Sequence, residues 1–133
     1  MPRPHNVFIT GASSGIGAAL ARRYAARGAA VGLFARRAAE LDTLAATLPA
    51  GRAVAYVGDV RDAAPLACAA ADFIARFGPP DVVIANAGIS RGVLTGLLEQ
   101  THRRFAMAVF IYCHSMPSTA SAQPHAQRPH FVV

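Results

Sequence analysis

The chain reads Thr10-Gly11-Ala12-Ser13-Ser14-Gly15-Ile16-Gly17 near its beginning, and we call these eight residues the glycine loop. An apolar run at residues 6–9 precedes the loop, and an alanine-rich stretch with helical spacing follows it. This order predicts a strand, a turn and a helix. A helix N-terminus offers unpaired backbone N–H groups and a partial positive charge, both of which suit a diphosphate. The glycine loop therefore predicts a dinucleotide-binding site.

Each glycine of the loop has a separate expected role. Gly11 allows the tight turn out of the strand, Gly15 lets the backbone approach the phosphates, and Gly17 lets the helix lie close to the sheet. The alternative is an ordinary strand-to-helix turn in which Ser13 or Ser14 caps the helix. We favour cofactor binding, and the binding residues that we assign within the loop are Gly11, Ser13, Ser14, Gly15, Ile16 and Gly17.

A second motif, Asn86-Ala87-Gly88, follows a later apolar stretch. With the T-G-x-x-x-G-x-G spacing of the glycine loop, it resembles the short-chain dehydrogenase/reductase family. The resemblance covers residues 5 to about 100. It implies an oxidoreductase that moves hydride between a nicotinamide dinucleotide and a carbonyl or alcohol substrate. It also implies that Asn86, Ala87 and Gly88 support the central sheet and border the cofactor ribose.

Strand and helix patterns alternate along the first part of the chain, which favours a parallel sheet with helices on its faces. The expected strands are residues 7–9, 30–35, 53–57 and 81–85, and the expected helices are residues 16–27, 41–48, 62–77 and 99–112. Right-handed crossovers give these strands the order 3-2-1-4. We therefore predict an α/β fold with an incomplete, Rossmann-like, doubly wound sheet of about four strands.

We divide the chain into a partial dinucleotide-binding Rossmann domain at residues 1–112 and a tail at residues 113–133. The tail has no periodicity and is rich in proline, serine and histidine, so we expect it to be disordered or poorly packed. A sheet that ends at the fourth strand leaves residues 82–84 on an open edge, which favours low stability, aggregation or dependence on a partner. The abrupt change of pattern suggests a longer reductase gene that is truncated, as after a frameshift.

Two arginines, Arg36 and Arg37, follow the second expected strand, where a dinucleotide site meets the adenosine ribose. An acidic residue at this place accepts hydrogen bonds from the ribose hydroxyls of NAD(H). Guanidinium groups instead suit a phosphate, so NADP(H) is favoured over NAD(H) as the cofactor. The alternative is that both arginines are surface residues at the start of the second helix.

Asp59 and Val60 follow the third expected strand. The family resemblance implies that an aspartate and an apolar neighbour here meet the adenine ring, with the carboxylate accepting from the adenine amino group. The alternative is a loop aspartate that only starts the next helix. Because Asp62 is available as the helix cap, we assign the adenine role to Asp59 and Val60.

Catalytic residues are not assigned. The resemblance implies a tyrosine as general acid/base, with its pKa lowered by a lysine four residues later, which is sensible because a phenol in water titrates near pH 10. This sequence holds no lysine, and its tyrosines are Tyr24, Tyr56 and Tyr112. We therefore expect the isolated chain to be inactive, and we expect a small-molecule substrate only in a full-length relative. The alternatives are a non-catalytic nucleotide-binding or interaction module, or a decayed gene fragment.

Composition narrows the remaining function classes. The net charge of +6 comes from scattered arginines with no interleaved aromatic stripe, so we expect no nucleic-acid partner. Cys68 and Cys113 form no C-x-x-C pair, and we expect neither a metal site nor a disulfide framework. No apolar run reaches the roughly 20 residues of a membrane span, and no signal segment is evident, so we expect a cytoplasmic protein without membrane contact. Substrate and oligomeric state stay open.

Overall fold

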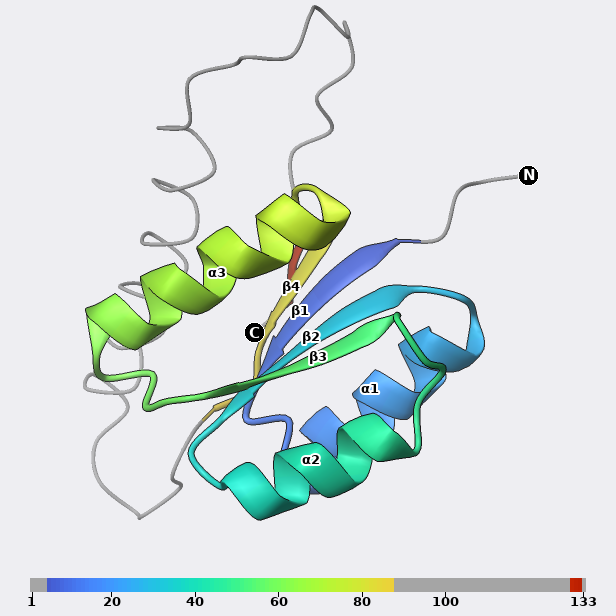
Figure 1. Cartoon of the computed structure of the whole chain (residues 1–133), viewed down its shortest axis with the longest axis horizontal. Coiled ribbons are helices and arrows are strands. Elements are labelled where there is room, and N and C mark those ends of the chain that lie inside the picture. Colours follow the sequence, from blue (N-terminus) through green and yellow to red (C-terminus); the bar gives the residue numbers. More distant parts are fainter. Residues whose placement is uncertain (1–4, 88–129, 133) are drawn as a thin grey trace, which may run out of the picture.

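Helices cover both faces of a single parallel sheet in the computed structural model, which describes residues 5–87 and 130–132 (Figure 1). The elements in chain order are β1 (Asn6–Thr10), α1 (Gly15–Ala26), β2 (Ala30–Ala35), α2 (Ala38–Ala46), β3 (Ala53–Val57), α3 (Ala63–Phe77), β4 (Val82–Ala85) and β5 (His130–Val132). α1 and α2 lie on one face of the sheet and α3 lies on the other (Figure 1). The expected Rossmann-like alternation of strands and helices is confirmed up to β4.

The strands of the described residues lie in the order β3-β2-β1-β4-β5, and all neighbours are parallel. The predicted order 3-2-1-4 is therefore confirmed, and the sheet is one strand wider than expected. β5 pairs with residues 82–84 of β4, so the expectation that this side of β4 is an open edge is wrong. A strand of three residues has too little periodicity to be recognised from sequence, and its pairing depends on a neighbour far away in the chain.

Part of the expected tail lies outside the described residues, namely 113–129 and 133, and so does the helix expected at residues 99–112. Of the tail, the described residues are those of β5, which belong to the sheet.

Two apolar cores form because successive side chains of a strand point to opposite faces of the sheet. Val7 and Ile9 of β1 pack on the side of α1 and α2, whereas Phe8 packs on the side of α3. Phe8 and Phe73 meet edge to face, with ring centroids 5.6 Å apart. A Cβ on Gly32 would lie only 2.7 Å from Phe8 and 2.8 Å from Phe73, so the absence of a side chain on β2 leaves room for these two rings.

α1 approaches the sheet closely because its buried residues are small. These residues are Gly17, Ala18, Ala21 and Ala25. Leu20 and Tyr24 pack at the margin of the same core, as their helical spacing predicts. Ile16 shares that spacing, but its side chain is 70% exposed and belongs to the surface of the glycine loop.

β3 is the outer strand next to β2, and it is half-buried instead of fully buried as its apolar sequence suggests. The Tyr56 hydroxyl donates a hydrogen bond of 2.7 Å to the Asp72 carboxylate of α3, which connects this outer strand to the helix above it. α3 begins after Asp62, which has the N-cap position but makes no capping hydrogen bond with its side chain. The expected position of Asp62 at the start of this helix is confirmed, whereas a capping bond from its side chain is not formed.

Candidate nucleotide-binding site

Four loops that follow strands β1 to β4 gather at one end of the sheet. Thr10, the last residue of β1, is in register with Phe34 of β2 and Ala85 of β4. Ala35, the last residue of β2, is in register with Val57 at the end of β3. The loops after these strands hold the predicted site residues. The carboxyl ends of parallel strands are where open α/β sheets bind ligands.

Gly11 makes the tight turn that the sequence predicts. Its φ of +66° is in the left-handed region, and a Cβ at this position would lie 2.8 Å from the carbonyl oxygen of Asn86 and 2.9 Å from the Cα of Ala87. Both the turn and the neighbouring segment therefore require a glycine. The close approach brings the glycine loop and the segment after β4 together.

Gly17 and Asn86 form a second contact between the same two segments. The Asn86 side-chain amide donates a hydrogen bond of 3.3 Å to the carbonyl oxygen of Gly11. A Cβ on Gly17 would collide with that carbonyl oxygen and would lie 2.7 Å from Nδ2 of Asn86. The start of α1 can therefore lie against the loop only without a side chain at position 17.

Thr10 is a site residue to which sequence reasoning assigned no role. It is 1% exposed, and its hydroxyl donates to the carbonyl oxygen of Ile84 at 3.5 Å while accepting from the backbone N–H of Ala87 at 3.2 Å. The hydroxyl therefore fixes the path of the chain as it leaves β4. A usable signal was present, because a threonine at the end of an otherwise apolar buried strand needs hydrogen-bond partners.

The start of α1 is open to solvent. Gly15 has a φ of +58°, and no atom lies within 4 Å of the position that its Cβ would take. Ser14 has the N-cap position, but its side chain makes no capping hydrogen bond. The N–H groups of a first helical turn have no partners within the helix. An open backbone with free donors fits the diphosphate of a dinucleotide, whereas the alternative of a Ser14-capped turn does not describe this segment.

Ser13 lies at the margin of the loop, where it lines a shallow cavity of about 270 Å³ between α1 and α2. The other residues that line this cavity are Ala18, Arg22, Ala39, Glu40, Thr43 and Leu44. The cavity is therefore next to the expected phosphate position but is not centred on it.

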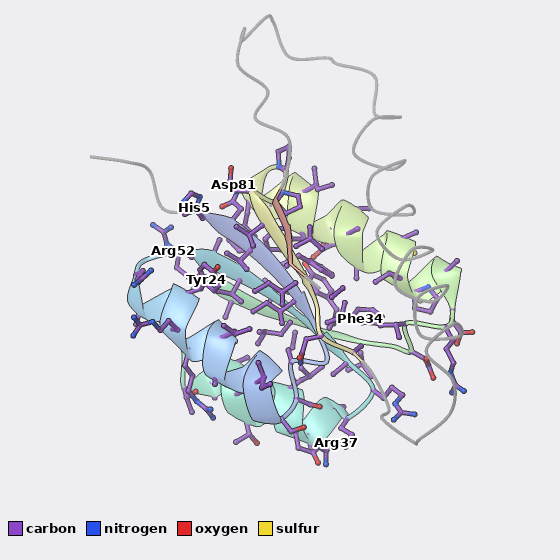
Figure 2. All side chains as sticks on the ribbon, turned by 180° about the vertical axis from the view of Figure 1, so that it is seen from behind. His5, Tyr24, Phe34, Arg37, Arg52 and Asp81 are labelled. Atoms are coloured by element: carbon purple, nitrogen blue, oxygen red, sulfur yellow. The ribbon has the colours of Figure 1, made fainter. Side chains whose placement is uncertain are left out.

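The two arginines after β2 differ in their surroundings. Arg37 lies at the end of the sheet away from His5 and Asp81 (Figure 2), and its guanidinium pairs with the Glu40 carboxylate at 2.9 Å. Arg36 is exposed, and within the described residues it makes neither a hydrogen bond nor an ion pair. Arg36 can therefore receive an anion without giving up a partner, and Arg37 cannot.

Asp59 is already bound by a residue that the sequence analysis did not consider. The Arg61 side chain donates from Nη2 to Oδ2 at 2.6 Å and from Nε to both carboxylate oxygens at 3.1 Å. These bonds are the main reason why the pKa of Asp59 falls to about 2, and the charge of Arg36 lowers it further. An arginine two residues after a loop aspartate is a signal that could have been used, because such aspartates bond the chain two residues onward.

Val60 is half-buried and packs against the core on the α3 side of the sheet. An adenine ring in its expected place can therefore contact only the exposed part of the Val60 side chain. Gly88, the last predicted site residue, lies outside the described residues.

The described helices include none that is long and apolar enough to cross a membrane.

A family model and individual relatives both identify this chain as similar to short-chain dehydrogenases. The family described as short chain dehydrogenase matches residues 5–120. D-threitol dehydrogenase from Mycolicibacterium smegmatis is 40% identical over 86 residues, which cover 63% of this chain and 33% of that protein. The chain spans about a third of the length of the curated relatives that it matches.

Solved structures show the same relationship. A short-chain dehydrogenase/reductase from Serratia marcescens matches with a TM-score of 0.66 and 28% identity, over 84% of this chain and 51% of that chain. L-sorbose reductase from Gluconobacter frateurii, solved with NADPH and L-sorbose, matches with a TM-score of 0.61 and 25% identity, over 82% of this chain and 44% of that chain. The family match over residues 5–120 includes the glycine loop and strands β1 to β4.

Proposed function

Because the chain belongs to the short-chain dehydrogenase family, we propose that it binds NADP(H) as the cofactor-binding part of an oxidoreductase. The proposed reaction of the whole protein is hydride transfer between the nicotinamide and a carbonyl or alcohol substrate. The observation that carries the proposal is the backbone at Gly15, which is open to solvent at the start of a helix. Such a place offers N–H donors and a positive helix end to phosphate groups.

Each segment of the site has a proposed part of the cofactor. The glycine loop, with Ser13, Ser14 and Ile16 beside its glycines, holds the diphosphate. Asp59 and Val60 meet the adenine, and the segment of Asn86, Ala87 and Gly88 borders the ribose on the nicotinamide side. When it is bound, the nicotinamide supplies or accepts the hydride. The residues of this chain bind and orient it.

The preference for NADP(H) is assigned mainly to Arg36. Its guanidinium has no partner among the described residues, and it lies close enough to Asp59 to lower the pKa of that carboxyl. Arg37 shares the position in sequence, but its ion pair with Glu40 makes it the weaker candidate. A free guanidinium at the adenosine end suits a 2′-phosphate. The NADPH complex of the Gluconobacter relative agrees with this choice without deciding it.

A second candidate function is a nucleotide-binding module without turnover. It is favoured by one observation, namely that these 133 residues contain no lysine to lower the pKa of a tyrosine. Both candidates require the same cofactor site, and they differ in whether a bound cofactor is consumed.

Titration of the 133-residue chain with NADPH, followed by an assay of NADPH oxidation with a carbonyl substrate, separates the two candidates. Binding without oxidation supports the module, and oxidation supports the enzyme. Absence of binding to a folded chain contradicts both and supports a decayed fragment. Gly15→Val is the site control, because a branched side chain at a positive φ blocks the approach of the phosphates. Unchanged affinity in this variant would remove the phosphate assignment.

A further inference from the structure

The loop between β3 and α3 contains a carboxylate that is bound through both of its oxygens by one neighbouring arginine. Oδ1 of Asp59 accepts from the backbone N–H of Arg61 at 2.9 Å and from Nε of Arg61 at 3.1 Å. Oδ2 accepts from Nε at 3.1 Å and from Nη2 at 2.6 Å. Nε carries one hydrogen, which the two oxygens share, so three N–H groups of Arg61 occupy most of the roughly four lone-pair sites of this carboxylate.

We propose that Arg61 is a specificity-determining residue that controls adenine recognition, because its side chain competes with the adenine amino group for the Asp59 carboxylate. This inference rests on the proposed function, in which Asp59 accepts a hydrogen bond from the cofactor's adenine. Adenine presents its exocyclic amino group as a donor. The side chain of Arg61 and the adenine therefore compete for the same two oxygens.

Exposure makes this displacement feasible. The Arg61 side chain is 72% exposed, whereas the Asp59 side chain is 20% exposed. Ion pairs with an exposed partner are weak, since water competes for both charges. Arg61 can therefore move into solvent while Asp59 stays in place, held by the backbone N–H of Arg61.

The competition has a measurable consequence for selectivity. While the Arg61 side chain is bound to the carboxylate, the free energy needed to release it offsets part of the binding free energy that the adenine hydrogen bond provides. Removing the Arg61 side chain should therefore raise the preference for adenine over a base without an amino group. A hydrogen bond to a charged acceptor changes affinity by roughly ten- to a hundredfold, and removing Arg61 restores only the part that its release offsets.

The test compares the dissociation constants of NADPH and of its hypoxanthine analogue, reduced nicotinamide hypoxanthine dinucleotide phosphate, for the 133-residue chain. Both ligands carry the same phosphates, so the loss of a positive charge in Arg61→Ala cancels in the ratio of the two constants. We expect this ratio to favour NADPH roughly three- to tenfold more in Arg61→Ala than in the original chain. Arg61→Lys keeps the charge without the forked donors and should give an intermediate ratio.

Two further variants identify the cause. Arg76→Ala removes an exposed arginine that pairs with Asp72 at 2.7 Å outside the site, and it should leave the ratio unchanged. Asp59→Asn should abolish the effect of Arg61→Ala, because the contested carboxylate is then absent. A merely structural role for Arg61 would change both affinities equally and leave the ratio constant.

The outcomes are distinct. If the original chain binds NADPH and neither Arg61→Ala nor Arg61→Lys changes the ratio of dissociation constants from its value in the original chain, the inference is wrong and the proposed function stands. If the folded original chain binds neither ligand, the proposed function fails and the inference fails with it. Circular dichroism of each variant shows whether it is folded. If Arg61→Ala is unfolded, the ratio for Arg61→Lys is compared with that of the original chain instead.

Discussion

Hydrogen bonds and close contacts at single residues connect the glycine loop with the segment after β4, which lies about 75 residues further along the chain. The Asn86 amide reaches the carbonyl oxygen of Gly11, and the Thr10 hydroxyl accepts from the N–H of Ala87. Gly17 leaves space for the Asn86 side chain. The two motifs are therefore one structural unit, in which a side chain added at position 11 or 17 would also displace the segment after β4.

Arg36→Asp tests the cofactor preference at the same scale. Replacing this guanidinium, which has no partner among the described residues, with a carboxylate removes a charge-assisted bond to the 2′-phosphate, which should cost about 2 kcal/mol of NADPH binding. NADH lacks this phosphate and should lose much less. Calorimetric titration with both cofactors measures the difference between the two losses. Arg23→Asp is the charge-matched control, because Arg23 is an exposed residue in the last turn of α1. Equal losses for the two cofactors would leave the phosphate role without support.

The pair of Asp59 and Arg61 predicts a specific dependence on acid. Arg61 lowers the pKa of Asp59 to about 2, whereas an aspartate in an unfolded chain titrates near 3.9. Ionised Asp59 therefore stabilises the fold above about pH 4, and this stabilisation is lost as the pH falls towards about pH 2. In Arg61→Ala the free energy of unfolding should change less over that range, as measured by urea unfolding at several pH values. Parallel curves for the variant and the original chain would contradict the prediction.

At the scale of the elements, small side chains and one polar bridge decide how the helices sit on the sheet. α1 presents glycine and alanine to the sheet, so its backbone lies close to β1 and to the glycine loop. α3 instead packs through Phe73 and Leu66, and its polar bridge reaches the outer strand. In that bridge the Asp72 carboxylate accepts from Tyr56 and pairs with Arg76, each at 2.7 Å.

Tyr56→Phe should lower the free energy of unfolding by about 1 kcal/mol, because it removes the hydrogen bond between β3 and α3. Burial and the nearby Asp72 raise the pKa of Tyr56, so its stabilising effect is present at neutral pH and is lost only in strong alkali. Tyr24→Phe is the matched control, since the Tyr24 hydroxyl makes no hydrogen bond with a described residue. Urea unfolding of both variants is the measurement, and equal effects would show that the bridge is not stabilising.

At the scale of the whole molecule, the sheet depends on chain segments that are far apart in sequence. β1 lies between β2 and β4, and β4 is flanked on its other side by β5, which lies 45 residues further along the chain. The central strands are apolar on both faces because helices cover both.

Proline at both Phe131 and Val132 tests the role of β5. Whichever N–H faces β4 is then missing, because proline has no backbone donor. We expect faster amide hydrogen exchange at residues 82–84 and a greater tendency to aggregate, as for any newly exposed strand edge. The double alanine variant keeps both N–H groups and is the control. If exchange at residues 82–84 is the same in both variants, the pairing of β5 does not protect β4.

The sequence by itself determined the order of strands and helices, the family and the position of the glycine loop. These features are local, since hydrophobic periodicity and glycine spacing act within a few neighbouring residues. Right-handed connection then determined the order 3-2-1-4. Both Arg36 and Arg37 lie directly after the second strand, as the sequence predicts, and their role towards the cofactor stays a prediction.

The tertiary structure alone decided the contacts between loops. It brought the Thr10 hydroxyl to the N–H of Ala87 and the Asn86 amide to the carbonyl oxygen of Gly11, and it placed β5 beside β4. The physical reason is that hydrogen bonds and ion pairs depend on distances of a few ångströms. Those distances are set only when the sheet brings the loops of different strands together at one end.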